Sequence, residues 1–121
     1  HRGEIGRRLI ERADANGTTV LALKSLALRR WEENEPKTWE KEWYRPAETR
    51  QDIERGLRFT LSRPVAAAVS PGHEELLWTA CDVADRFVPL TEEEERGIRE
   101  YALGPETDAY RLLFSRTVTS L

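Results

Sequence analysis

Cysteine and histidine are nearly absent from this 121-residue chain, which has one cysteine, Cys81, and two histidines, His1 and His73. A single thiol cannot form an intramolecular disulfide, and it cannot build a zinc site with only two histidines available. Disulfides are a feature of oxidising compartments. We therefore expect a cytoplasmic protein without a metal site, in which Cys81 is a small core residue.

Long hydrophobic runs and an excess of basic residues are also missing. No apolar segment approaches the roughly 18 residues that span a bilayer, and the start of the chain does not resemble a signal peptide. The net charge of −3 argues against a nucleic-acid partner, since Arg29, Arg30 and Trp31 form only a small basic patch. With 39% hydrophobic and 34% charged residues, the composition is that of a soluble globular domain.

Four segments have the pattern of amphipathic helices. The first places Ile5, Leu9 and Ala13 on one face, and the second repeats this spacing with Ile53 and Leu57. The last begins with Thr91 and, three residues later, Glu94, which together form the sequence of a capping box. The predicted helices are residues 3–15, 49–62, 73–87 and 91–103.

Two short apolar runs, residues 18–23 and 65–69, are the predicted strands. Each lacks a polar face, which is typical of strands buried on both sides in a parallel sheet, and their alternation with helices predicts an α/β fold. Two such strands do not make an adequate sheet. Because the chain also starts at His1 rather than methionine, we expect either a part of a larger barrel or sheet, or a chain that associates with something else.

A long connection rich in tryptophan separates the first strand from the second helix. Residues 29–48 contain two prolines and show no sustained period, which predicts an irregular loop with at most one helical turn. The tryptophans at positions 31, 39 and 43, together with Tyr44, have two interpretations: they line a substrate pocket, or they fasten the loop to the domain.

Three ordered stretches, "GTTVLALKSLA" (17–27), "LRFTLSRPVAAAVSPG" (57–72) and "DRFVPLTEEE" (85–94), resemble the C-terminal part of aldo/keto reductases. The resemblance covers residues 3–103 and implies the last two strands and helices of a (β/α)8 TIM barrel. Residues 1–104 are then a helix-rich barrel fragment with two short parallel strands and about four helices, and residues 105–121 are a tail.

The resemblance also implies a site for NAD or NADP. Leu23 would lie against the nicotinamide, Lys24 and Ser25 would approach the pyrophosphate, and the loop after the second strand would face the adenosine ribose or its 2′-phosphate. Glu74 and Glu75 follow this loop, and two carboxylates do not favour the phosphate of NADP. The implied cofactor-binding residues are Leu23, Lys24, Ser25, Leu26, Ser70, Pro71, Gly72 and His73.

The catalytic residues implied by the resemblance are an Asp, a Tyr, a Lys and a His on earlier barrel strands, which this chain does not contain. We therefore assign no catalytic residue and expect the chain alone to be inactive, while the complete enzyme would interconvert a small carbonyl substrate and its alcohol. The alternative is a non-catalytic helical module that binds a protein partner, or itself, through its unsatisfied strands and its Trp-rich loop.

Overall fold

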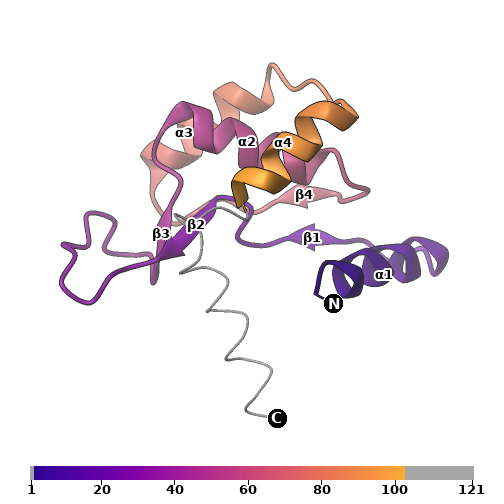
Figure 1. Ribbon diagram of the computed structural model, residues 1–121, viewed down its shortest axis with the longest axis horizontal. Coiled ribbons are helices and arrows are strands. Elements are labelled where there is room, and N and C mark those ends of the chain that lie inside the picture. The colour runs from indigo at the N-terminus through magenta and orange to yellow at the C-terminus, as the bar shows by residue number, and fades with distance from the viewer. Residues whose placement is uncertain (1, 103–121) are drawn as a thin grey trace, which may run out of the picture.

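The computed structural model describes residues 2–102 and shows a mixed α/β arrangement of helices and short strands (Figure 1). The tail predicted for residues 105–121 lies outside this part. In chain order the elements are α1 (Arg2–Ala15), β1 (Leu21–Ala22), β2 (Ala27–Arg30), β3 (Tyr44–Pro46), α2 (Arg50–Leu61), β4 (Ala67–Ala68), α3 (Glu74–Ala84) and α4 (Glu92–Ala102).

The four predicted helices are confirmed, with ends that differ by at most a few residues. Hydroxyl side chains start two of them, because the first backbone N–H groups of a helix have no partner within it. The Thr49 hydroxyl accepts a hydrogen bond from the N–H of Asp52 at 3.1 Å. At α4, the N–H of Glu94 donates to the Thr91 hydroxyl at 3.2 Å and the N–H of Thr91 donates to the Glu94 carboxylate at 2.9 Å. The capping box is therefore present.

Strands β1 and β4 form the predicted parallel pair, but each is only 2 residues long and therefore shorter than the predicted strands 18–23 and 65–69. Leu21 lies opposite Ala67 and Ala22 opposite Ala68, and the N–H of Val69 extends the ladder by donating to the Ala22 carbonyl at 2.9 Å. The connection between them includes α2, as expected for a crossover between parallel strands. Two short parallel strands with helices are thus shown, in agreement with an α/β fold.

The prediction of an irregular loop over residues 29–48 was wrong at both of its ends. Strands β2 and β3 form an antiparallel pair in which Arg29 lies opposite Arg45 and Arg30 opposite Tyr44. Neither strand is long enough to show an alternating pattern, and a register irregularity between Ala27 and Arg29 interrupts what alternation there is. The pairing brings the Trp-rich segment between them to the edge of the domain.

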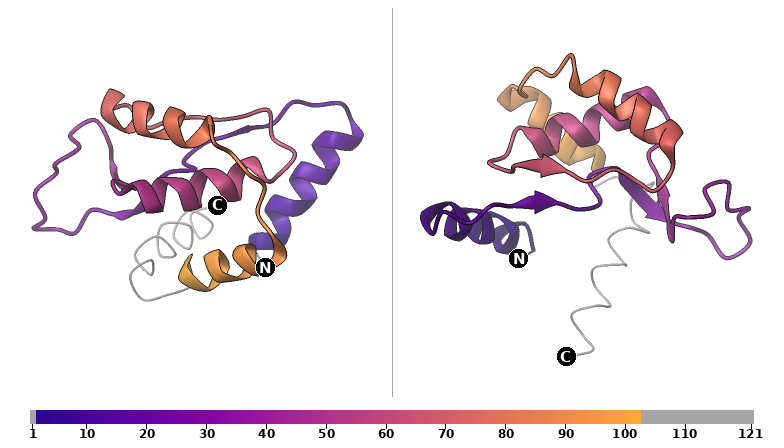
Figure 2. Two further views of the ribbon diagram at one scale, coloured as in Figure 1. Left: turned by 90° about the horizontal axis from the view of Figure 1, so that it is seen from above. Right: turned by 180° about the vertical axis from the view of Figure 1, so that it is seen from behind.

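Helices cover one face of the β1–β4 pair. Figures 1 and 2 show α2, α3 and α4 on the same side of these strands, with α1 standing apart at the start of β1. The core lies where α2 packs against α3 and against the turn after β1, around the fully buried Ile53 and Leu26. The other buried apolar residues of this core are Ala47, Leu57, Leu76, Ala80 and Val83.

The opposite face of the strand pair is open, so the expectation that the first strand is buried on both sides was wrong. Leu21 is 59% exposed, Leu23 is 69% exposed and Val69 is 41% exposed. The helices shield only the alternate positions, such as Ala22, which is half-buried. Cys81 is also exposed rather than buried, because the face of α3 that packs in the core carries Leu76, Ala80 and Val83.

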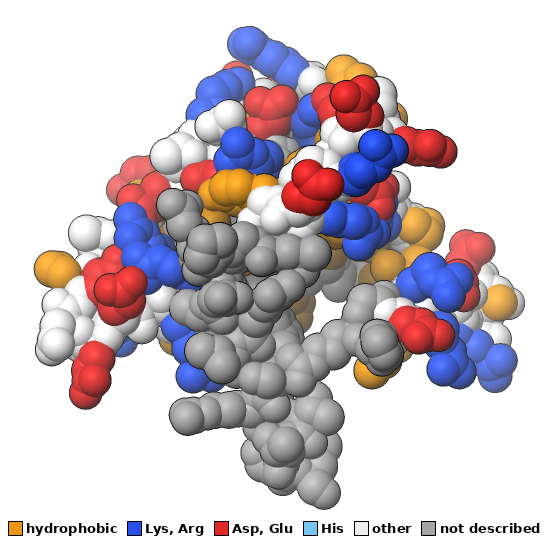
Figure 3. All heavy atoms as spheres, in the orientation of Figure 1, with side chains coloured by type: hydrophobic (Ala, Val, Ile, Leu, Met, Phe, Trp, Pro, Cys, Tyr) orange, Lys and Arg blue, Asp and Glu red, His pale blue; other side chains and the backbone are white. Residues whose placement is uncertain are grey.

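Charged side chains of both signs alternate over the face seen in Figure 3, without a large patch of one sign. Many of them are paired across elements, for example Arg58 of α2 with Glu94 of α4 at 2.8 Å and Arg50 with Asp82 of α3 at 2.5 Å. Within residues 2–102, no helix is long and apolar enough to cross a membrane.

Gly56 allows α2 to touch the backbone of the turn after β1. A Cβ atom at this position would lie 2.5 Å from the Ser25 carbonyl oxygen and 3.2 Å from a methyl group of Leu26. Both distances are shorter than a normal carbon contact, and the first one involves backbone that a side-chain rotation cannot move. The absence of a side chain at Gly56 therefore sets how closely α2 packs on residues 25 and 26.

We expect Gly56→Ala to destabilise the chain by about 1–3 kcal/mol, because the new methyl group overpacks the contact with Ser25. Gly97→Ala is the matched control: it also lies in a helix, and a Cβ there would meet nothing within 4 Å. That variant should gain about 0.5–1 kcal/mol from the better helix propensity of alanine. Urea unfolding followed by circular dichroism measures both, and equal effects of the two substitutions would contradict the close contact.

Candidate functional site

The two loops implicated by the sequence lie at the same edge of the β1–β4 pair. Because the strands are parallel, residues 24–26 and residues 70–73 both follow carboxyl ends, where α/β proteins bind ligands. Ser25, Leu26 and Ser70 line one cavity of about 310 Å³ between β4, the turn after β1, α2 and α3. The remaining wall of this cavity is mostly apolar, with Leu57, Leu61 and Leu77 among its residues.

The turn after β1 separates its residues into different environments. Lys24 has a left-handed backbone (φ 60°), and the N–H of Ala27 donates to the Lys24 carbonyl at 3.1 Å to close the turn. Leu26 is only 2% exposed and belongs to the core, whereas Leu23 points away from the helices and is largely exposed. Between them, the Ser25 hydroxyl oxygen is buried and has no hydrogen-bond partner in the described part of the chain.

The Lys24 side chain lies on an aromatic ring. Its Nζ atom is 4.4 Å from the centroid of the Trp43 ring, which is a cation–π contact. Trp43 itself is 54% exposed and is held edge-on against Tyr44, with ring centroids 5.5 Å apart. The lysine that the resemblance assigns to a cofactor phosphate therefore has an aromatic partner within the chain.

The loop after β4 is in contact with the Trp-rich segment. The N–H of Gly72 donates to a carboxylate oxygen of Glu42, and the N–H of Lys41 donates to Nε2 of His73 at 3.2 Å. The His73 ring also meets the Trp39 ring edge-on, with centroids 5.0 Å apart. Pro71 is buried and Ser70 is half-buried beside the cavity, so each of residues 70–73 has a defined neighbour.

Glu42 is the functional candidate that the sequence does not reveal. It is 7% exposed and is the one charged side chain that is buried among residues 4–102. Its backbone is fixed on both sides, since its N–H donates to the Trp39 carbonyl at 3.0 Å and its carbonyl accepts from the Trp31 indole at 2.9 Å. In the sequence it is one of several glutamates in this segment, and only the contact with Gly72 distinguishes it.

The tryptophans at positions 31 and 39 have contacts that fasten the segment rather than line a pocket. Trp31 donates its indole N–H to the Glu42 carbonyl, and Trp39 packs against the core and against His73. Trp43 and Tyr44 continue this row, and Tyr44 is buried at 7% exposure. These contacts agree with the second of the two interpretations of the aromatic residues.

An ion cluster holds the β2–β3 pair together. Arg29 donates two hydrogen bonds of 2.7 Å to the Glu35 carboxylate, and Arg45 contacts the same carboxylate at 2.6 Å. The Arg29 hydrogen bond, followed by the one from the Glu32 N–H, lowers the pKa of Glu35 from its ordinary value of 4.5 to about 2. The same pairing raises the pKa of Arg29.

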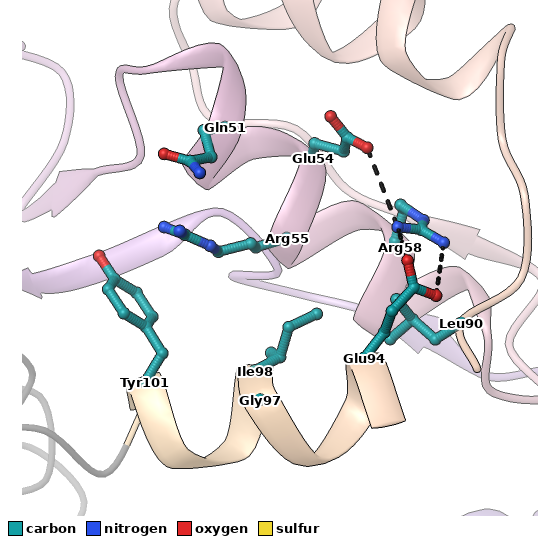
Figure 4. Close-up of a pocket in the computed structure, with 9 residues that line it drawn as sticks. All are labelled: Gln51, Glu54, Arg55, Arg58, Leu90, Glu94, Gly97, Ile98 and Tyr101. Carbon is teal, nitrogen blue, oxygen red and sulfur yellow. Dashed lines mark hydrogen bonds and ion pairs between the residues drawn. The ribbon is translucent and has the colours of Figure 1, made fainter. Parts of the chain in front are cut away.

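A second hollow, of about 370 Å³, lies between α2 and α4 (Figure 4). Its charges are paired with each other: Arg58 contacts Glu94 and Glu54, and Arg55 pairs with Asp52 and lies 4.4 Å from the Tyr101 ring centroid. Residues 2–102 contain no group of His, Cys, Asp or Glu side chains arranged to hold a metal ion. The strand-end loops are the candidate site because both follow the carboxyl ends of parallel strands.

The chain matches no protein-family model, no curated protein and no solved structure. The likeness to aldo/keto reductases therefore depends on the three quoted stretches alone.

The lowered pKa of Glu35 predicts acid sensitivity of the β2–β3 pair. A carboxylate whose pKa is lower in the folded chain stabilises it above the ordinary pKa and loses this effect as the pH falls through the folded pKa. We expect the Trp31 indole resonance to lose its folded position between pH 4.5 and about 2. Glu35→Gln should show this change already at neutral pH.

Glu33→Gln is the control for this prediction. Glu33 is exposed in the same segment, and its substitution removes the same charge. It should leave the acid profile of the Trp31 resonance as it is in the parent sequence. A Glu35→Gln variant with an unaltered profile would contradict the role of the Arg29–Glu35–Arg45 cluster.

Proposed function

We propose that this chain forms the cofactor-phosphate side of an NAD(P)-dependent aldo/keto reductase built on a (β/α)8 barrel. The observation that carries the proposal is the meeting of residues 24–26 and residues 70–73 at the carboxyl ends of two parallel strands, around the cavity lined by Ser25 and Ser70. These are the loops that the resemblance assigns to the dinucleotide, and barrel enzymes commonly bind phosphate after their last two strands.

The residues present fit a dinucleotide in part. The buried Ser25 hydroxyl has no hydrogen-bond partner among the described residues, so it could donate to a phosphate oxygen if the turn moved to admit one, and the neighbouring Lys24 supplies a positive charge. Residues 70–73 would face the adenosine ribose and the phosphate joined to it, and Glu74 and Glu75 beside them favour the diol of NAD over the 2′-phosphate of NADP. The cofactor would supply the hydride, while this chain positions it and contributes no catalytic residue.

The open face of the β1–β4 pair supports the barrel part of the proposal. Leu21, Leu23 and Val69 expose apolar area opposite the helices, where a barrel would place its interior side chains. Apolar side chains that are exposed on a strand are more easily explained by a protein surface that would pack on them than by a role in contact with water. The rest of the barrel would provide that cover, together with the substrate pocket and the proton donor.

We expect weak but localised binding of NAD to the chain alone, with a dissociation constant of about 1 mM, because most of the groove is absent. Amide chemical shifts measured during titration with NAD should change at Ser25 and at residues 70–72. Ser25→Ala should remove the response at position 25 while leaving the fold intact by circular dichroism.

Adenosine, which lacks phosphates, is the control ligand and should leave the Ser25 amide unmoved. Absence of any change at Ser25 and residues 70–72 with both NAD and NADP at about 10 mM would overturn the proposed function, since that concentration exceeds the expected constant about tenfold.

A second candidate function, self-association, is favoured by the same open face. Both strands have only one partner each in the described residues, so their outer edges are available for pairing. In that case sedimentation should show a dimer that Leu21→Gln and Leu23→Gln dissociate, while Trp78→Gln, a change at an equally exposed position on α3, leaves it intact. A monomer at about 100 μM would exclude this candidate for the chain alone.

A further inference from the structure

Residues 39–43, the segment that precedes β3, contact both loops of the candidate site. Glu42 accepts the hydrogen bond of the Gly72 N–H, and the next residue, Trp43, covers the Lys24 ammonium group at 4.4 Å. Lys41 and Trp39 add contacts to His73. The side chains of Glu42 and Trp43 thus contact the Gly72 N–H and the Lys24 ammonium group, the two groups that a phosphate-bearing ligand would use.

The Glu42 carboxylate occupies the place of an anion. Gly72 lies two residues before the start of α3, and the N–H groups at a helix start attract negative charge. His73, the N-cap residue, makes no side-chain hydrogen bond to the helix. Exposed Glu74 and Glu75 lie in the first turn of α3, but the buried carboxylate of Glu42 is the negative group that accepts the Gly72 hydrogen bond.

Trp43 contacts the cation of the site, the Lys24 ammonium group, as Glu42 contacts the Gly72 N–H. The face of an indole ring attracts an ammonium group, as an anion does, although more weakly. Lys24 is exposed and Trp43 is half-exposed, so the contact is open to exchange with a ligand from solution. Because Glu42 and Trp43 are adjacent, one displacement of the segment would release Gly72 and Lys24 together.

From these contacts we propose that Glu42 and Trp43 act as an internal competitor for anionic ligands, and that a diphosphate group binds the loops only by displacing them. The inference rests on the proposed function, which identifies the two loops as a binding site. It adds the residues that set the affinity of these loops for a diphosphate group. Glu42 opposes binding in two ways: it holds the Gly72 N–H, and its charge repels a phosphate placed beside it.

The test uses the full chain and inorganic pyrophosphate, followed by the amide resonance of Gly72 and the indole resonance of Trp43. Glu42→Gln keeps an oxygen that can accept the Gly72 hydrogen bond but removes the charge, so its affinity for pyrophosphate should rise about tenfold. Glu40→Gln is the matched control, because Glu40 is exposed in the same segment and its loss changes the net charge equally. Its affinity should stay within about twofold of the parent value.

Equal gains in Glu42→Gln and Glu40→Gln would overturn the proposal, because they would reflect net charge alone. The parent chain gives an independent measurement that needs no variant to fold. Saturating pyrophosphate should shift the Gly72 amide and the Trp43 indole with one common dissociation constant, and a Gly72 response without a Trp43 response would contradict the joint displacement.

The outcome is distinguishable from failure of the proposed function. If Glu42→Gln binds pyrophosphate at Gly72 but neither NAD nor NADP affects the chain, the internal competitor stands and the dinucleotide function fails. If NAD shifts Ser25 and residues 70–72 with the same affinity in the parent and in Glu42→Gln, the dinucleotide function stands and the competitor role of Glu42 is wrong.

Discussion

The packing of α2 on the turn after β1 is the contact on which the rest of the structure depends. Gly56 brings the helix to the Ser25 backbone, Leu26 fills the core beside Ile53, and the Leu26 carbonyl accepts a hydrogen bond from the Ala47 N–H at 2.8 Å. The same short turn thus joins the helix, the end of β3 and the parallel strand pair. Without it, residues 24–26 would have no fixed position relative to residues 70–73.

Ion pairs determine the arrangement of the outer elements more than they determine stability. Arg58 links α2 to α4 through Glu94, whose pKa falls to about 2 chiefly because of that hydrogen bond, and Arg29 and Arg45 converge on Glu35. The exposed Arg58–Glu94 pair contributes little free energy, since water screens it, whereas the Glu35 cluster is part-buried and less screened. Their planar, bidentate geometry instead fixes direction. The Glu35 cluster fixes the β2–β3 pair and so the position of residues 39–43.

Local patterns in the sequence predicted the helices, because a stripe of apolar residues such as Ile53 and Leu57, or a cap such as Thr91, acts within a few turns of chain. The parallel pairing also followed, and with it the meeting of the two loops. Features that depend on distant contacts did not follow: the β2–β3 pair, the exposure of Leu21 and Cys81, and the burial of Glu42 against Gly72. No local pattern encodes which of many glutamates loses its contact with water.

Among the described residues, the Ser25 hydroxyl and the Trp39 indole N–H are the buried polar side-chain atoms without a hydrogen-bond partner, whereas the Gly72 N–H and Lys24 have partners within the chain. A ligand that takes the Gly72 N–H from Glu42 exchanges one charge-assisted hydrogen bond for another, and such an exchange yields little net free energy. The net free energy of binding would then come from three other contacts. These are a hydrogen bond to the unpaired Ser25 hydroxyl, a second phosphate near Lys24, and burial of the open face of β1 and β4. Under the proposed function, a diphosphate joined to two ribosides would provide the first two of these contacts, and the rest of a barrel would provide the third, whereas a single small anion would not provide all three.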